Sequence, residues 1–206
     1  MRRVFLVFAL TALCSLAVAA PAIAKRSGGG VGYTLVGSAT LVSPGHNSPT
    51  GVQLTSTESG ASLTWGAIGF AIAPGLRLRQ VNTLATDYEF LDGSCWDGSP
   101  RFTVGVSRKA ATTAETYFYI GPPPNYTGCP PGIWASTGNL ATPSSPVDDS
   151  HLPGGSPYDT YADAQARYGD YLVKYIAIDL DGGAGGNQAV DFDNTQVNST
   201  LYTYEP

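Results

Sequence analysis

The sequence predicts an all-β fold, a single antiparallel β-sandwich that is jelly-roll-like and has one short α-helix near residues 160–168. Three observations lead to this prediction. Short runs rich in β-branched and aromatic residues alternate with clusters of glycine, proline, asparagine, aspartate and serine, the pattern of strands joined by turns. Two cysteines lie outside the N-terminal segment, as in an exported domain closed by one disulfide. Only one stretch has the composition and the ends of a helix.

The N-terminal segment has the pattern of a secretory signal peptide. Two arginines precede an apolar run, and the run ends in the small-residue sequence AIA before Lys25. We therefore expect a signal peptide at residues 1–24, a flexible leader at 25–30 and one β-sandwich domain at 31–206, in a secreted, extracellular protein. No second long apolar stretch follows, so we expect no membrane span after signal cleavage.

The charge balance argues against two classes of partner. The chain has 11 lysines and arginines against 16 aspartates and glutamates, and two of the arginines lie in the predicted signal peptide. Binding to nucleic acid or to an anionic membrane surface requires clustered positive charge, which this composition does not supply. We therefore expect no nucleic-acid partner.

The strand-like runs follow one another from the start of the domain to its end. In the run 61–73 the alternation changes phase near Gly66, which suggests a bulge or a turn. The run 101–107 is expected to point Phe102, Val104 and Val106 inward. Other predicted strands are 33–42, 51–57, 76–81, 116–121, 171–180 and two closing runs near the C-terminus.

The predicted helix has recognisable ends. Thr160 is followed three residues later by Asp163, a variant of the capping box, and Gly169 supplies a stop. Tyr161 and Tyr168 fall on one face of this helix, which we expect to lie across one end of a sheet.

Chain geometry predicts the disulfide. The runs 101–107 and 116–121 read as an antiparallel hairpin centred near residue 112, and Cys95 and Cys129 lie equally far from that centre. Positions equidistant from a hairpin turn lie opposite one another, so we expect the two cysteines to be bridged. The proline-rich loop GPPPNYTGCPPG would then be fastened to the loop that precedes its partner strand.

Several segments resemble a recurrent, uncharacterised type of secreted bacterial β-sandwich domain. They include LATDYEFLDGSCWDGSPRF, YFYIGPPPNYTGC and YDTYADAQARYGD, and the resemblance runs from about Leu76 to the end of the chain. The closing segment VDFDNTQVNSTLYTYEP is similar to the last strands of jelly-roll carbohydrate-binding modules. This second resemblance implies a binding role for the domain.

Catalytic motifs are few. The chain lacks the G-x-S-x-G and H-E-x-x-H sequences, and its two histidines, His46 and His151, lie in loops rich in proline, glycine and serine. We therefore favour a protein without catalytic activity.

Four aspartates near the C-terminus occur as two pairs, and in each pair one residue separates the two aspartates. If the two segments that carry them pair, the carboxylates would converge at one sheet edge. Three interpretations remain open: solvated turn residues, a structural calcium site, or the acid and base of a glycosidase. These candidate metal ligands are Asp179, Asp181, Asp191 and Asp193.

Aromatic residues flank both cysteines. Trp96 follows Cys95, and Tyr126 and Trp134 lie on either side of Cys129. A disulfide would gather the three rings, which would either stack on sugar rings or pack against the bridge. The sequence therefore predicts a secreted, non-catalytic module that binds a glycan or a cell-surface ligand. The alternatives are a structural or adhesive extracellular protein and, third, an enzyme acting on polysaccharide.

Overall fold

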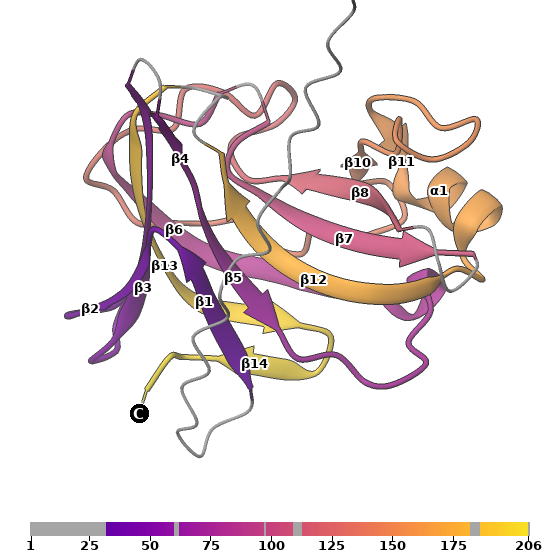
Figure 1. Ribbon diagram of the computed structural model, residues 1–206, viewed down its shortest axis with the longest axis horizontal. Coiled ribbons are helices and arrows are strands. Elements are labelled where there is room, and N and C mark those ends of the chain that lie inside the picture. The colour runs from indigo at the N-terminus through magenta and orange to yellow at the C-terminus, as the bar shows by residue number, and fades with distance from the viewer. Residues whose placement is uncertain (1–31, 60–61, 97, 109–112, 182–185, 206) are drawn as a thin grey trace, which may run out of the picture.

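The computed structural model describes residues 32–59, 62–96, 98–108, 113–181 and 186–205, and Figure 1 shows their arrangement. Two antiparallel sheets pack face to face, as the sequence predicts. The predicted signal peptide and leader lie outside the described residues. Among the described helices, none is long and apolar enough to cross a membrane.

The first sheet, which we call sheet A, has the strand order β1-β5-β12-β7-β8. Its members are β1 (Tyr33–Gly37), β5 (Gly66–Phe70), β7 (Arg101–Ser107), β8 (Ala114–Tyr119) and β12 (Leu172–Leu180). The central strand β12 pairs with β5 on one side and with β7 on the other, so segments distant in sequence lie side by side.

The second sheet, sheet B, has the order β2-β3-β13-β6-β9. Its members are β2 (Ala39–Val42), β3 (Gly51–Ser59), β6 (Leu84–Asp92), β9 (Ala135–Ser136) and β13 (Gln188–Val197). Strand β14 (Thr200–Tyr202) pairs with β13, and β4 (Ser62–Thr64) pairs with β3. A separate pair is formed by β10 (Pro146–Val147) and β11 (Asp159–Thr160).

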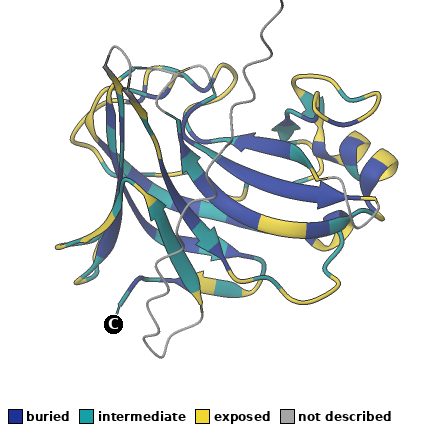
Figure 2. Cartoon of the chain, in the orientation of Figure 1, coloured by how far each residue is buried: buried dark blue, intermediate teal, exposed yellow. Residues whose placement is uncertain are grey.

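The core lies between the two sheets. Strand β7 points Phe102, Val104 and Val106 inward, as predicted, and all three are fully buried. They belong to the same buried cluster as side chains of sheet B such as Val190 and Phe192, which are equally buried. Figure 2 shows these buried residues in dark blue. Because alternate residues of a strand face opposite ways, the other residues of each strand form the outer faces on which a ligand site can be built.

The chain changes sheet at two corners that touch each other. Residues 33–42 are not one strand, as the sequence suggested, because the chain turns at Ser38 and passes from β1 into β2. The phase change near Gly66 is the second corner, where β4 gives way to β5. The backbone N–H of Ser38 donates to the carbonyl of Trp65 at 2.8 Å. This bond joins the two corners and satisfies polar groups that leave the sheet ladders.

One predicted strand is wrong. Residues 76–81 alternate in sequence, yet Leu78–Gln80 form a short 3₁₀ helix, η1. Leu78 and Val81 are both fully buried and their carbonyls both accept hydrogen bonds from the Tyr161 hydroxyl, at 2.8 and 2.7 Å. Burial of two residues three apart suits a helical turn better than a strand.

The predicted helix is confirmed as α1 (Tyr161–Tyr168). The Thr160 hydroxyl accepts from the backbone N–H of Asp163, and Gly169 ends the helix. Its buried face holds Tyr161, Ala164 and Tyr168. Figure 1 shows α1 beside β10 and β11 at one end of the sandwich.

Candidate functional site

A disulfide fixes the base of the candidate site. Cys95 and Cys129 are bridged, with their Cα atoms 5.3 Å apart, as predicted. Strands β7 and β8 form the expected hairpin, in which Arg101 lies opposite Tyr119. A Cβ atom on Gly121 would lie 2.9 Å from the Cys95 sulfur, so the chain leaves β8 directly against the bridge only because residue 121 is glycine.

Beside the disulfide lies an open cavity of about 250 Å³, which we call the loop pocket. Two of its aromatic side chains reach into solvent: Trp96 is 60% exposed and Tyr158 is 61% exposed. Tyr126 is only 6% exposed and forms part of the wall. The lining residues are Trp96, Gly98, Tyr119, Asn125, Tyr126, Thr127 and Tyr158.

The pocket is built around Tyr119, the last residue of β8. Its ring centroid lies 5.8 Å from that of Tyr126 and 6.1 Å from that of Tyr158. Its hydroxyl donates to a carboxylate oxygen of Asp148 at 2.6 Å. Burial, followed by this hydrogen bond, raises the pKa of Tyr119 well above its ordinary value, so the phenol stays protonated at neutral pH. A Cβ atom on Gly98 would lie 2.9 Å from the Tyr119 ring, so glycine allows the Trp96 loop to approach it.

The backbone holds Trp96 in place without covering its ring. The N–H of Trp96 donates to the Ser99 carbonyl at 3.1 Å, and the N–H of Ser99 donates back to the Trp96 carbonyl at 3.0 Å. The neighbouring Cys95 is almost fully buried and bridged. The exposed indole is therefore carried on a short segment that is fixed at both ends.

The three predicted aromatic residues do not form one site. Trp96 and Tyr126 both line the loop pocket, but Trp134 lies elsewhere, next to β9 of sheet B. Its ring stacks on His46, with centroids 4.8 Å apart and planes inclined by 6°. The expected gathering of all three rings by the disulfide is therefore wrong for Trp134, whereas the predicted exposed indole is present at Trp96.

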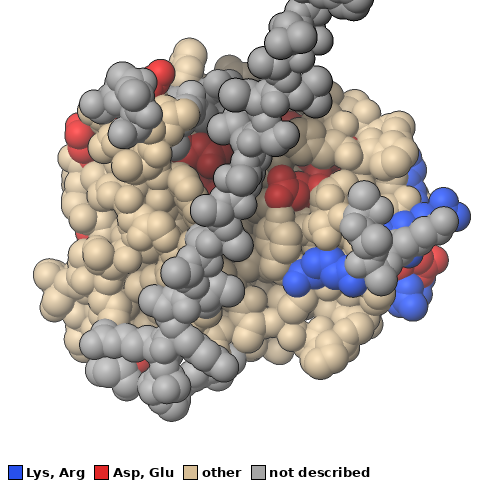
Figure 3. All heavy atoms as spheres, viewed as in Figure 1, with Lys and Arg blue, Asp and Glu red and all other residues tan. Residues whose placement is uncertain are grey.

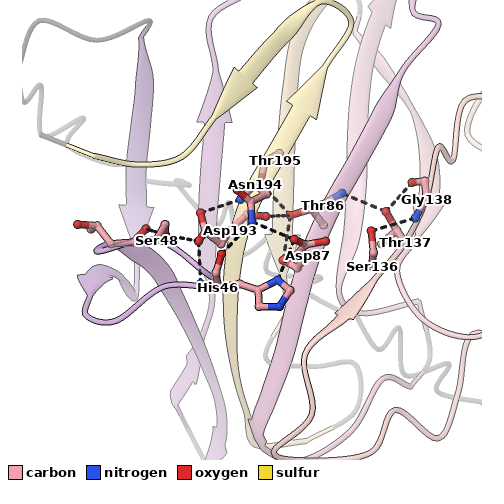
Figure 4. A network of polar contacts seen from close by, with 11 residues as sticks. His46, Ser48, Thr86, Asp87, Ser136, Thr137, Gly138, Asp193, Asn194 and Thr195 are labelled. Atoms are coloured by element: carbon pink, nitrogen blue, oxygen red, sulfur yellow. Dashed lines mark hydrogen bonds and ion pairs between the residues drawn. The ribbon is translucent and has the colours of Figure 1, made fainter.

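A polar network holds His46 against Trp134, and Figure 4 shows its members. The His46 Nδ1 lies 2.9 Å from an Asp87 carboxylate oxygen. Asp193 accepts hydrogen bonds from the His46 backbone N–H at 2.8 Å and from the Ser48 hydroxyl at 2.5 Å. The Asn194 amide bridges to Asp87 at 3.0 Å. These contacts fasten the β2–β3 loop onto β13, and the hydroxyl of Ser48 is directed to Asp193.

The four aspartates do not converge. Asp179 lies on β12 and Asp181 follows it in sheet A, whereas Asp191 and Asp193 lie on β13 in sheet B. The two strands do not pair, so the predicted common edge is wrong. The described residues contain no group of three or more His, Cys, Asp or Glu that could hold a metal ion, and calcium binding stays an untested prediction.

Each aspartate has a local partner or a buried environment. Asp181 forms an ion pair with Arg101, and Asp191 accepts from the Gln53 side-chain amide at 2.9 Å. Burial raises the pKa of Asp179 to about 6 and raises the pKa of Asp191 in the same direction. Asp191 and Asp193 are buried and hydrogen-bonded, as structural carboxylates are, whereas the Asp181 side chain is 40% exposed where it follows β12.

The sequence analysis did not single out two aromatic residues of the loop pocket, Tyr119 and Tyr158. Tyr119 was visible as the residue that faces away from Phe118 on its strand, and that alternation was the available signal. Tyr158 had no such signal. It comes close because Tyr117 and Asp148 form an isolated β-bridge, which carries the loop 148–158 past the end of β8.

Comparison with known proteins supports the fold. No protein-family model and no curated protein sequence matches the chain. Among solved structures, the family 11 carbohydrate-binding module of the cellulosomal cellulase Lic26A-Cel5E of Clostridium thermocellum is similar. The TM-score is 0.50 at 12% sequence identity, over 90% of this chain and 98% of the module. This similarity confirms the jelly-roll-like sandwich and the predicted resemblance to such modules.

A second similar structure is the L4b domain of human laminin α-2, with a TM-score of 0.35 and 10% identity over 82% of this chain and 98% of that domain.

Proposed function

We propose that this protein is a secreted, non-catalytic module that binds glycan in the loop pocket. The single observation that carries the proposal is the exposed indole of Trp96, fixed on a disulfide-anchored segment beside Tyr158 and above an open cavity. A soluble domain that exposes two large aromatic rings at one place has a surface suited to a partner.

The chemistry of the pocket fits a neutral sugar. The apolar faces of sugar rings stack on aromatic side chains, and Trp96 and Tyr158 offer such faces. Asn125 and Thr127 add a side-chain amide and a hydroxyl that can exchange hydrogen bonds with sugar hydroxyls. Among the residues that the structure describes, those that line the pocket are uncharged.

The scaffold around the pocket reduces the entropic cost of binding. The disulfide and the tight turn at Trp96 hold the ring before any ligand arrives. Tyr126, Tyr119 and Tyr158 pack in a row, which limits their rotamers. A preorganised surface loses little conformational entropy on binding.

Isothermal titration of the mature chain with glycans selected on a glycan array tests this proposal. Trp96→Ala should weaken binding at least about tenfold, because stacking on one aromatic ring contributes on the order of 1 kcal/mol or more. The matched control is Trp65→Ala, since Trp65 is also an exposed indole but lies at the corner between β4 and β5. Equal affinities of Trp96→Ala and the wild type would contradict the proposal.

A further inference from the structure

The loop between β10 and β11, residues 148–158, brings Tyr158 to the loop pocket. The ring of Tyr158 packs on Tyr119, with the centroids 6.1 Å apart, and is otherwise open to solvent. The backbone of Tyr158 has a φ of 60°, in the left-handed region that residues other than glycine rarely adopt. Such a conformation persists only where the surrounding structure holds it. The position of the ring therefore depends on how the ends of this loop are fixed.

One arginine pairs with both ends of the loop. Arg167 lies in the last turn of α1, and its Nη2 is 3.1 Å from a carboxylate oxygen of Asp149, at the start of the loop. The same nitrogen forms an ion pair with Asp159, the residue that directly follows Tyr158. Val147 and Asp159 are partners in the register of β10 and β11, so the loop closes next to this arginine.

Burial of Asp149 makes this pairing necessary. Asp149 is fully buried, and its second carboxylate oxygen accepts from the Ser156 backbone N–H at 2.7 Å. A buried carboxylate is stable only when its charge is paired, and Arg167 supplies the positive charge. Loss of Arg167 would therefore leave an uncompensated buried charge at the start of the loop and would release Asp159 at its end.

Helix α1 is a rigid base for Arg167. Its face toward the core holds Tyr161 and Tyr168, both almost fully buried, and the Tyr168 hydroxyl donates to the Pro153 carbonyl in the loop at 3.0 Å. In Figure 3, basic atoms gather at the side of the molecule where Figure 1 places α1, and acidic atoms lie beside them. A positive charge in the last turn of a helix is also favoured by the helix dipole.

We propose that Arg167 is a positioning residue of the loop pocket, which holds Tyr158 where its ring stacks on a neutral sugar. This assignment rests on the proposed glycan function and adds a residue that lies outside the pocket lining. The pocket then has two aromatic side chains with separate supports. Trp96 is held by the segment next to the disulfide, and Tyr158 is held by the ion pairs of Arg167. Loss of one support should leave the other ring in place.

The test is isothermal titration of the mature chain with neutral oligomers of glucose, xylose and N-acetylglucosamine of equal length, followed with the oligomer that binds most tightly. Tyr158→Ala should weaken binding about fivefold, because it removes one stacking ring. Arg167→Met should weaken binding to a similar extent. Arg167→Lys should recover part of the loss, since an ammonium group can also donate to both carboxylates. Unchanged affinity of a folded Arg167→Met protein would overturn the assignment.

Double variants distinguish positioning from a general loss of stability. If Arg167 acts through Tyr158, Arg167→Met should have no further effect in a Tyr158→Ala protein and its full effect in a Trp96→Ala protein. A loss of equal size in both backgrounds would refute the positioning role. The matched control is Arg79→Met, because Arg79 pairs with Asp170 just beyond α1, at 2.7 Å. The control should bind as the wild type does.

A milder variant covers the case in which Arg167→Met does not fold. Asp159→Asn leaves the buried pair of Arg167 with Asp149 intact and removes only the charge next to Tyr158. It should weaken binding about threefold, and this effect should also vanish in a Tyr158→Ala protein. Thermal melting verifies that each variant is folded. Wild-type affinity of Asp159→Asn would then overturn the assignment.

The outcomes separate this assignment from the proposed function. If binding depends on Trp96 but on neither Tyr158 nor Arg167, only the positioning role fails. If binding depends on Tyr158 and Arg167 but not on Trp96, the role of the exposed indole fails and the positioning role stands. If none of the oligomers binds, both fail.

Discussion

Trp96 and Trp134 offer the most informative comparison in this molecule. Each lies within five residues of a bridged cysteine, on a loop rich in proline or glycine. Trp96 is 60% exposed beside an open cavity, whereas Trp134 is half-buried and stacks on His46. Closeness to a disulfide in sequence therefore does not decide whether a ring is free to bind. What decides it is whether a side chain from a distant loop, such as His46, packs against the ring.

The same contrast holds for the supports of the two rings. The Trp96 segment is held by backbone hydrogen bonds and a covalent bridge, which leave the ring uncovered. The Trp134 ring is held by a side chain whose position depends on Asp87 and Asp193. Changes to each support should therefore affect one ring and spare the other.

Removal of the disulfide should have the largest effect. Cys95→Ser together with Cys129→Ser should lower the free energy of unfolding by about 4 kcal/mol, because the bridge restricts the unfolded chain. Denaturant unfolding measures this change, and thiol titration of the denatured, unreduced wild type should find no free thiol outside the signal peptide. Glycan affinity at the loop pocket should fall as well. Two titratable thiols would contradict the bridge.

Loss of the Asp193 carboxylate should have the second-largest effect on stability. Asp193→Ala leaves the backbone N–H groups of His46 and Asn194 without their acceptor in a buried site. The expected cost is about 2 to 3 kcal/mol of unfolding free energy. The emission of Trp134 should change as His46 moves, while glycan binding at Trp96 stays intact. Asp92→Ala, at the exposed end of β6, is the control.

Replacement of Asp179 in sheet A should stabilise the protein, whereas the two preceding changes destabilise it. Burial raises its pKa to about 6 from an ordinary 3.8, so the folded state binds the proton more tightly than the unfolded state. The wild type should therefore lose stability from this group as the pH rises from about 4 to 6. Asp179→Asn should be more stable than the wild type above pH 6, by up to about 2 kcal/mol, with the difference vanishing below pH 4. Chemical denaturation across this pH range measures it, and a pH-independent difference would contradict the burial argument.

The smallest effect on stability is expected from the exposed ring itself. Trp96→Ala removes a side chain that is mostly in solvent, so the free energy of unfolding should change by no more than about 0.5 kcal/mol. Urea titration measures this. A loss of several kcal/mol would show that the indole is part of the core, and the binding role assigned to it would lose its support.

The disulfide and the helix could be predicted from the sequence because local geometry determines both. The hairpin of β7 and β8 brings Cys95 and Cys129 together because antiparallel pairing places equidistant residues opposite each other. The cap at Thr160 and the stop at Gly169 define the helix for the same reason. In each case the signal and the structure that it predicts lie within a few tens of residues.

Contacts that arise where the chain passes between sheets could not be predicted from the sequence. Asp179 and Asp191 are close in sequence, but their strands belong to different sheets, so the expected convergence does not occur. The stack of His46 on Trp134 and the arrival of Tyr158 at the loop pocket depend on contacts between distant loops. The position of the Tyr175 ring against Gly105 depends on the register between β12 and β7, which no local pattern reveals.

Glycan titration of Trp96→Ala and Trp134→Ala side by side tests whether the loop pocket is the binding site. The two substitutions remove the same side chain next to the same disulfide. Trp96→Ala should lose affinity at least about tenfold, whereas Trp134→Ala should bind as the wild type does. Loss of binding in Trp134→Ala with full binding in Trp96→Ala would contradict binding in the loop pocket and would place the site on sheet B.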